Sequence, residues 1–262
     1  MSFAPTEDEA LKRLEMIFQR LRAHNLKLAP KKCFFLRRSV RFLGHVIDSQ
    51  GISTDPSKVE AITNVVRADL MKADGLTPDV KKIQSFLGLV MWYQRFIENC
   101  STIAKPLFHL TAGCKQVRAH RGGKKKKVSV SRQLTAADWT PDCEQALHKL
   151  KDALLASVVL AHPDFSRPFI LATDASSDGL AAVLSQVLPG EDRARPIAFA
   201  SRTLSKAQSK YPAHRLEFFA LKWAVCDKFS HWLKGHKFTA WTDKNPLTHI
   251  LTKPRLDACE QR

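Results

Sequence analysis

The pattern of apolar and polar residues divides the 262-residue chain into an amphipathic N-terminal helix, a short β region, a helical region and an alternating α/β region. Between residues 6 and 25, apolar side chains recur every three or four positions behind an acidic start, which is typical of a helix. Residues 33–48 predict two strands about a short basic turn, and residues 49–51 mark the next break. A helix followed by a β-hairpin is therefore expected first.

The next region carries two helix starts and a long apolar stripe. Asp55 is predicted to cap a helix with Pro56 at its first position, and Thr77-Pro78 predicts a second, longer helix in the same way. The apolar side chains that follow keep helical spacing, at Ile83, Phe86, Leu87, Val90, Tyr93, Phe96 and Ile97. These features predict a compact helical module between about residues 52 and 110, with the aromatic residues in its core.

Beyond residue 139, helices and strands alternate. Thr140 and Pro141 predict the start of a helix that runs to about residue 155. A long helix is expected at about residues 206–233, and strands are expected at residues 169–173, 180–186, 197–201 and 238–242. The turn signals Asp178-Gly179 and Pro189-Gly190 predict antiparallel pairing of the first three strands, whereas the helix is long enough for a crossover. The sheet is therefore predicted to be mixed.

The charge of the chain favours nucleic acid as a partner. Its 42 Lys and Arg against 25 Asp and Glu give a formal net charge of +17, which attracts polyanions. No membrane partner is expected, because the sequence has no signal peptide and no apolar run of about 18 residues. The six cysteines and ten histidines lack metal-ligand spacing, so zinc is not expected. We expect an intracellular protein, cytoplasmic and also nuclear if an import signal is present.

One segment is unusually basic. Residues 115–132 contain eight Lys and Arg and no acid, which predicts a flexible basic linker. Three interpretations stay open from the sequence: a solvated connector, a nucleic-acid contact, or a nuclear-import signal. The nucleic-acid contacts expected in this segment are Lys124, Lys125, Lys126 and Lys127.

Three acidic residues lie at positions where the apolar and polar pattern predicts no structural role for them. Asp174 and Asp243 each end a predicted strand, and Glu217 lies on a mostly small, apolar face of the long helix. An aspartate at a strand end is often a turn former or a helix cap, but Asp178-Gly179 and Asn245-Pro246 already supply those signals. Carboxylates at the carboxyl edge of a sheet suit two Mg²⁺ ions, or Mn²⁺, in phosphodiester hydrolysis.

Several motifs resemble the Pol polyproteins of Ty3/gypsy-type retrotransposons. The motifs similar to the ribonuclease H domain of that family are TDASSDGLAAVLSQ (173–186), PIAFASRTL (196–204) and FTAWTDKNPL (238–247). The motifs similar to the end of a reverse transcriptase palm and its thumb are NLKLAPKKC (25–33), VRFLGHVI (40–47), DPSKVEAI (55–62) and SFLGLVMWYQRFI (85–97). The resemblance follows the family's order and covers nearly the whole chain.

The resemblance implies an α/β chain, α+β overall, with a ribonuclease H-like fold. A palm-end β-hairpin and a small helical thumb would precede a mixed sheet of the five-stranded type that lacks its last strand. The domains expected are a palm remnant at 1–50, a thumb at 51–112, the basic linker at 113–138 and a truncated ribonuclease H-like domain at 139–262.

The resemblance also implies a site and a substrate. Asp174, Glu217 and Asp243 match the family's first three catalytic and metal-binding carboxylates, and residues 42–45 resemble the hairpin that holds a primer end. The further nucleic-acid contacts expected are Phe42, Leu43, Gly44, His45 and Arg202. The implied substrate is the RNA strand of an RNA–DNA hybrid, held through its backbone and shape, and an upstream palm and fingers segment is the implied protein partner.

Two family features are absent from the sequence. The aspartate pair of the polymerase site would precede Ser2, so polymerisation by this chain alone is not expected. The fourth carboxylate of the ribonuclease H site would follow Leu251 through a further helix and strand, and the chain ends at Arg262. Three hypotheses therefore stay open: ribonuclease H-type cleavage, a catalytically dead nucleic-acid-binding remnant, and a domesticated interaction protein.

Overall fold

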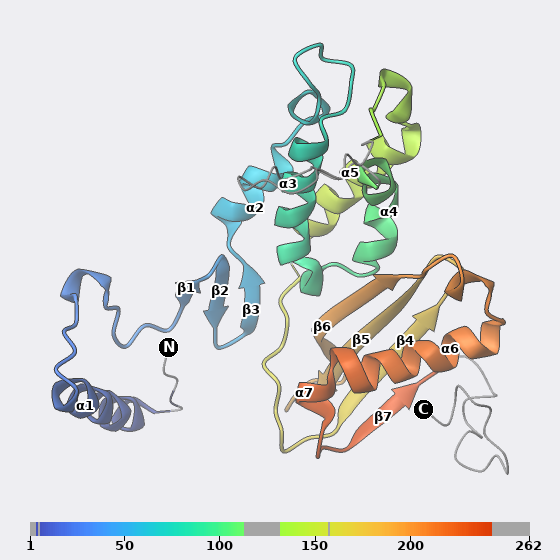
Figure 1. Cartoon of the computed structure of the whole chain (residues 1–262). Helices are drawn as coiled ribbons and strands as arrows, with labels where there is room; N and C mark the ends of the chain where they lie inside the picture. Colours follow the sequence, from blue (N-terminus) through green and yellow to red (C-terminus); the bar gives the residue numbers. More distant parts are fainter. Residues whose placement is uncertain (1–3, 5, 113–131, 157, 243–262) are drawn as a thin grey trace, which may run out of the picture.

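The computed structural model describes residue 4 and residues 6–112, 132–156 and 158–242. The α-helices are α1 (Glu7–Ala23), α2 (Pro56–Thr63), α3 (Val80–Trp92), α4 (Cys100–Thr111), α5 (Pro141–Leu155), α6 (Ala213–Lys222) and α7 (Ser230–Leu233). The strands are β1 (Val40–Phe42), β2 (His45–Asp48), β3 (Gly51–Thr54), β4 (Phe169–Ala175), β5 (Gly179–Val187), β6 (Ala194–Thr203) and β7 (Phe238–Trp241). Helices α2–α5 lie beside the sheet β4–β7, while α1 stands apart (Figure 1).

The N-terminal helix forms as its sequence predicts. Thr6 caps α1 by accepting a hydrogen bond from the backbone N–H of Glu9 at 3.3 Å, and three acids occupy the first turn. No residue of α1 is buried, and its apolar side meets Phe35 through an edge-to-face contact of Phe18 at 5.9 Å between ring centroids. The helix is therefore specified locally, by its cap and its charges.

The β region differs from the expectation in the position of its turn. The predicted basic turn forms no hairpin, and the first two strands instead pair about Leu43-Gly44. Both residues have positive φ, 49° and 78°, as a two-residue hairpin turn requires. Strand β3 extends the antiparallel sheet through the register His45↔Thr54 to Asp48↔Gly51. The glycine, which takes positive φ without a side-chain clash, fixes the turn here.

Helices α2 to α4 form the expected helical module. All seven residues of the predicted apolar stripe are buried, and Asp55 caps α2 with Pro56 at its first position. The second start lies later than predicted, because Asp79 rather than Thr77 accepts hydrogen bonds from the N–H groups of Lys81 (2.8 Å) and Lys82 (3.4 Å). The stripe is also not one helix: α3 ends at Trp92, and α4 begins after Asn99, whose φ is 53°.

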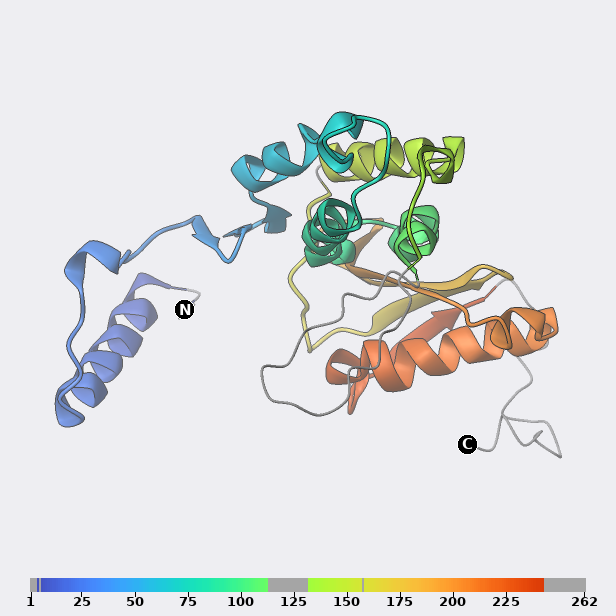
Figure 2. The same cartoon turned by 45° about the horizontal axis from the view of Figure 1, so that its top comes forward.

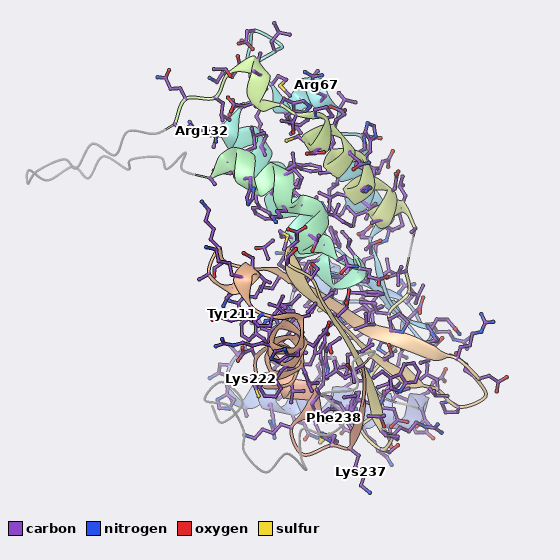
Figure 3. All side chains as sticks on the ribbon, turned by 90° about the vertical axis from the view of Figure 1, so that its right-hand side faces the viewer. Arg67, Arg132, Tyr211, Lys222, Lys237 and Phe238 are labelled. Atoms are coloured by element: carbon purple, nitrogen blue, oxygen red, sulfur yellow. The ribbon has the colours of Figure 1, made fainter. Side chains whose placement is uncertain are left out.

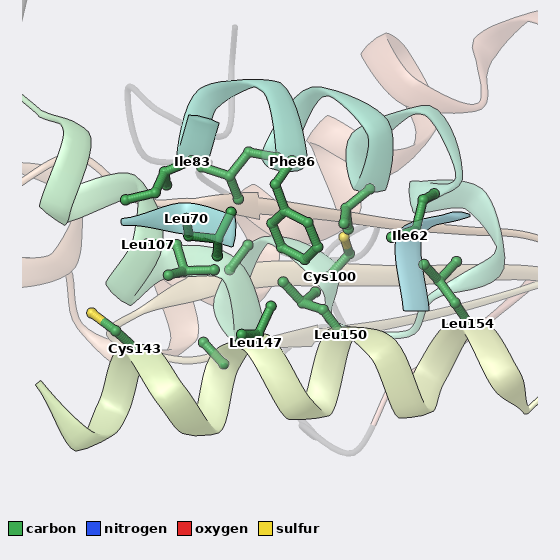
Figure 4. Close-up of a cluster of buried hydrophobic side chains, with 14 of the residues drawn as sticks. Ile62, Leu70, Ile83, Phe86, Cys100, Leu107, Cys143, Leu147, Leu150 and Leu154 are labelled. Carbon is green, nitrogen blue, oxygen red and sulfur yellow. The ribbon is translucent and has the colours of Figure 1, made fainter. Parts of the chain in front are cut away.

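Helix α5 packs into the same core. Its buried side chains are Cys143, Ala146, Leu147, Leu150 and Leu154, and they face residues of α2, α3 and α4 such as Ile62, Phe86 and Leu107 (Figure 4). Leu134, from the predicted linker, joins them. The domain boundary predicted at residue 139 stays a prediction, and the packing shows that the helix after it shares its core with the helices before the linker.

Strands β4 to β7 form a four-stranded mixed sheet in the order β6-β5-β4-β7. The β4–β5 and β5–β6 pairs are antiparallel, whereas β7 runs parallel to β4. The expected long helix becomes α6, a π-helical segment at Trp223–Lys228, and α7. Together they cover one face of the sheet over a core that includes Phe169, Ala220 and Phe229. The predicted mixed sheet with a crossover helix is confirmed.

The opposite face of this sheet is covered by the helical module. Helix α4 packs on β6, so that the sheet lies between α4 and α6 (Figure 2). The sheet β1–β3 is linked to the segment between α5 and β4, because Ile52 and Leu160 exchange backbone hydrogen bonds of 2.8 and 2.9 Å. No helix within the described ranges is long and apolar enough to cross a bilayer.

Candidate active site at the carboxyl edge of the sheet

Asp174 lies near the carboxyl end of β4, opposite Ala181 of β5, and its side chain is exposed. The turn that follows does not use it. The hydroxyl of Ser176 accepts the N–H groups of Asp178 and Gly179, each at 3.2 Å, and the Ser176 N–H donates to the Gly179 carbonyl at 2.9 Å. Among the described residues, no hydrogen bond or ion pair engages the Asp174 carboxylate. A turn-forming role for Asp174 is therefore excluded within that part of the chain.

Glu217 is buried in the second turn of α6, with 2% of its surface exposed. The helix packs on β4 and β5, and Ala220 of α6 and Ala224 of the π-helical segment after it are fully buried, so that helix and sheet approach closely. The neighbouring Arg215 lays its guanidinium over the ring of Tyr211, 4.0 Å from the ring centroid. A buried carboxylate is costly unless a cation or hydrogen-bond donors compensate its charge.

The two strands that precede the predicted aspartates end at one edge of the sheet. Strands β4 and β7 are parallel and in register through Ala172↔Trp241, so both end on the same side of the sheet. Asp243 itself lies outside the described residues, as do Lys124, Lys125, Lys126 and Lys127. Within the described residues there is no group of three or more His, Cys, Asp or Glu that could hold a metal ion. Of the predicted triad, the structure therefore places Asp174 and Glu217.

The hairpin predicted to contact nucleic acid is held by two aromatic residues at the C-terminal end of α3, Trp92 and its C-cap Tyr93. The indole N–H of Trp92 donates to the Leu43 carbonyl at 3.3 Å, and the Tyr93 hydroxyl donates to the Gly44 carbonyl at 2.9 Å. Phe42 and Leu43 are 47% and 65% exposed, so the tip presents apolar surface to solvent. A Cβ on Gly44 would lie 2.8 Å from the Tyr93 hydroxyl, which leaves little room for any other residue.

His45 turns inward instead. Its ring stacks on Phe96, with centroids 5.5 Å apart and planes at 26°, and it also faces Trp92 and Tyr93. Burial, and then the nearby charge of Arg95, lower the pKa of His45 below its ordinary value of 6.5. Its Nε2 is buried without a hydrogen-bond partner among the described residues. His45 therefore braces the hairpin against the helix as a neutral ring.

The last predicted contact, Arg202, lies near the end of β6. Its guanidinium sits over the ring of Phe219 in α6, 5.6 Å from the centroid. It thus lies on the α6 side of the same carboxyl edge. No sequence pattern predicts this stacking, because the two residues lie in different elements.

Sequence reasoning missed a set of contacts between α4 and the turn after Asp174. The Lys105 ammonium donates to the Asp178 carboxylate at 2.6 Å. A Cβ on Gly179 would lie 2.9 Å from the Thr102 hydroxyl oxygen and 2.9 Å from the Arg202 carbonyl oxygen. The sequence predicts only a turn at Asp178-Gly179, since a partner 73 residues away leaves no local pattern. Helix α4 therefore braces the loop beside the candidate site.

Comparison with known proteins agrees with this arrangement. Residues 139–240 match the family described as an RNase H-like domain found in reverse transcriptase. Over 96% of the chain, the sequence is 34% identical to the Pol polyprotein of transposon 297 of Drosophila melanogaster, and over 98% it is 31% identical to that of transposon gypsy. The chain is a homologue of Ty3/gypsy Pol polyproteins. Its residues 139–240 are an RNase H-like domain of the reverse transcriptase type.

The Pol homologue is much shorter than these relatives, since it spans 21% and 22% of their lengths. Solved foamy viral protease-reverse transcriptases share its fold. One, in complex with double-stranded DNA, has a TM-score of 0.71 and 22% identity over 96% of this chain and 39% of its own. Another, in complex with an RNA/DNA hybrid, has a TM-score of 0.69 and 21% identity over 99% of this chain and 32% of its own. The resemblance drawn from the motifs is thus confirmed.

Proposed function

We propose that this Pol homologue carries the ribonuclease H function of its family, the metal-dependent hydrolysis of the RNA strand in RNA–DNA hybrids. The observation that carries the proposal is Glu217, a carboxylate buried in α6 against the strand whose end bears Asp174. Neither a turn role for Asp174 nor a surface role for Glu217 accounts for this placement. The family match shows an RNase H-like domain, and the activity of that domain is the proposal.

The donor set fits a hard divalent cation. Asp174 and Glu217 offer carboxylate oxygens, which Mg²⁺ and Mn²⁺ prefer, and RNase H-like domains generally use divalent metal ions. Asp243 follows Trp241 by two positions, as Asp174 follows Ala172, and Ala172 and Trp241 are partners in the parallel pair. This count supports Asp243 as the third ligand of the same edge.

The residues would divide the work as follows. Glu217, held rigidly by the packed helix, would fix the position of a metal, while the exposed Asp174 would reach both metal and substrate. The bound metal, when present, would lower the pKa of a water molecule and stabilise the leaving oxygen in an in-line displacement. The packed helix and strand would hold the two carboxylates in a fixed orientation. A misplacement of such groups by about 1 Å can lower the reaction rate about 100-fold.

The test is hybrid cleavage by the full chain. An RNA–DNA hybrid with end-labelled RNA is incubated with Mg²⁺ or Mn²⁺, and with EDTA as a blank. Asp174→Asn, Glu217→Gln and Asp243→Asn should each lower the rate by about 100-fold or more, because each removes a ligand charge while keeping the side-chain shape. Asp192→Asn, a change in the loop between β5 and β6, is the matched control and should cut at the parental rate. Parental cleavage by all three variants would refute the proposal.

A second candidate function is nucleic-acid binding without catalysis. It is favoured by the net charge of +17. The solved relatives bound to double-stranded DNA and to an RNA/DNA hybrid support a nucleic-acid partner for this chain as well. It predicts salt-sensitive hybrid binding and no cleavage in either metal. The same assay therefore separates the two candidates.

A further inference from the structure

Helix α4 meets the end of the β4–β5 hairpin through three side chains on one of its faces. Lys105 follows Ser101 by four positions and Thr102 by three, which places all three on the same side of the helix. The Lys105 ammonium donates to the Asp178 carboxylate at 2.6 Å. The Thr102 hydroxyl oxygen lies 2.9 Å from the position that a Cβ on Gly179 would take, so the glycine lets the helix come this close.

These contacts lie beside the row of the sheet that contains Asp174. Ser101 is hydrogen-bonded to Ser201, and Ser201 shares the row of Asp174 through their common partner Ala181. Lys105 acts further along the hairpin, at the turn that joins β4 to β5. Helix α4 therefore contacts the hairpin at the level of Asp174 and again at its tip.

The two placed carboxylates of the candidate site are held from opposite faces of the sheet. Figure 3 shows the helical module, marked by Arg67, on one side of the sheet and α6, marked by Lys222, on the other. Helix α6 carries Glu217 itself, whereas Asp174 is exposed and lies on a strand. Because no hydrogen bond or ion pair within the described ranges engages the Asp174 carboxylate, its position depends on the backbone of the hairpin. Helix α4 holds this backbone from outside the sheet.

The Lys105–Asp178 pair is too exposed to be explained by stability. Its side chains are 29% and 56% exposed, and ion pairs of that exposure contribute little to the free energy of folding. The junction of α4 and β6 rests instead on buried contacts such as the serine pair. What the ion pair adds is direction, because it connects the turn after Asp174 to a helix whose other side is packed in the helical core.

We infer that Lys105 is a positioning residue of the candidate site, which holds the turn at Asp178 and thereby keeps the Asp174 carboxylate in place for a divalent metal. The inference rests on the proposed function in taking Asp174 as a metal ligand. Lys105 is a cation and does not touch the metal itself. The helical module therefore takes part in the site through the hairpin alone.

The sign of the effect separates positioning from simple electrostatics. By Coulomb's law, removing a positive charge near a cation site should tighten metal binding. Loss of a positioning contact should weaken metal binding, because the ligand then occupies the binding geometry for a smaller fraction of the time. Lys105→Met therefore gives opposite results under the two explanations.

The first measurement is Mn²⁺ binding by the full chain without nucleic acid, monitored by the electron paramagnetic resonance of free Mn²⁺. Lys105→Met should weaken binding about 5-fold, which corresponds to a modest coupling between two sites. Lys105→Arg keeps the charge and a donor for Asp178, and it should bind Mn²⁺ as the parent chain does.

The matched control is Arg167→Met, which also removes one positive charge from an ion pair. Arg167 pairs with Asp164 at 3.3 Å, and the two side chains are 40% and 39% exposed. The pair precedes β4, at the end of the strand opposite to Asp174. Arg167→Met should therefore bind Mn²⁺ with parental affinity.

The second measurement needs no metal. Amide hydrogen exchange across residues 175–181 should be about 2- to 5-fold faster in Lys105→Met than in the parent chain, because an ion pair of this exposure changes a local opening equilibrium by about that factor. Arg167→Met should leave the exchange of these amides unchanged.

Parental or tighter Mn²⁺ binding in Lys105→Met would overturn the inference, as would parental amide exchange. Asp174→Asn separates this failure from failure of the proposed function. If Asp174→Asn weakens Mn²⁺ binding and Lys105→Met does not, the positioning role fails and the metal site stands. If Asp174→Asn binds Mn²⁺ as the parent chain does, the proposed function fails, and the positioning of a metal ligand fails with it.

Discussion

Ser101 of α4 and Ser201 of β6 are joined by two reciprocal hydrogen bonds. The Ser101 N–H donates to the Ser201 hydroxyl at 2.7 Å, and the Ser101 hydroxyl donates to the Ser201 carbonyl at 2.9 Å. Both residues are 8% exposed. In the sheet register, Ser201 lies opposite Ala181, which lies opposite Asp174. The serine pair therefore connects the helical module to the row of paired residues that contains Asp174.

This pair should contribute measurably to stability. Ser101→Ala and Ser201→Ala should each lower the free energy of unfolding by about 1–3 kcal/mol, because each leaves a buried polar group without its partner. Each bond joins one side chain to the other residue's backbone, so each substitution removes one bond, and urea denaturation of the double variant should show a loss close to the sum of the two. Ser49→Ala, in an exposed turn, serves as the control. Losses in Ser101→Ala and Ser201→Ala no larger than that of Ser49→Ala would contradict the two bonds.

Gly51 should tolerate no side chain. Its φ is 146°, and a Cβ there would lie 2.1 Å from the Leu160 carbonyl oxygen, which accepts the N–H of Ile52. Gly51→Ala should therefore cost about 3 kcal/mol or more, through strain and a broken bridge between the two sheets. Gly88→Ala, where nothing lies within 4 Å of the added carbon, should instead stabilise α3 by about 0.5–1 kcal/mol. Thermal unfolding measures both, and equal effects would rule out the clash.

His45 predicts a pH dependence of stability. Because its pKa in the folded chain lies below 6.5, the unfolded chain binds more protons just under that pH, and stability should fall as the pH drops below about 6.5. The pKa values of Asp55, Asp74, Asp138 and Asp164 are also lowered. The stability that these carboxylates contribute is lost in more acidic solution, as the pH falls below the ordinary carboxyl pKa of 3.8. The free energy of unfolding, measured with urea between pH 7 and 5, should stop falling with pH in His45→Phe. It should still fall in His24→Gln. An unchanged slope in His45→Phe would contradict the assignment.

Divalent metal should stabilise the folded chain. A ligand that binds only the native state adds about 2.7 kcal/mol at 100 times its dissociation constant. Mn²⁺ and Mg²⁺ should therefore raise the midpoint of thermal unfolding, and Glu217→Gln or Asp174→Asn should reduce the increase. Asp192→Asn should keep it. This measurement reports metal binding whether or not the chain cuts RNA, and an equal increase in all variants would place the metal elsewhere.

Most elements were predictable because their signals are local. A pattern of a few neighbouring residues is enough to predict α2 from Asp55-Pro56, α3 from its apolar stripe, and β4 to β6 from their alternating residues. The prediction of a basic turn at Arg37-Arg38 is wrong, because polar residues alone do not make a hairpin turn, whereas Leu43 and Gly44 adopt the positive φ that a two-residue turn needs. The start of α3 was misplaced because Thr77 and Asp79 are both capable caps, and only the fold shows which one is used.

The sequence by itself determined the mixed sheet, the crossover helix and the similarity to Pol polyproteins, because periodicity, turn residues and motifs are properties of neighbouring residues. The three-carboxylate site stays a prediction. Only the tertiary structure decided that α4 covers the sheet, that α5 completes the helical core, and that Arg202 stacks on Phe219. The pairs Ser101–Ser201 and Lys105–Asp178 lie 100 and 73 residues apart. Such contacts form where packed surfaces happen to be complementary, and no local pattern of residues encodes that.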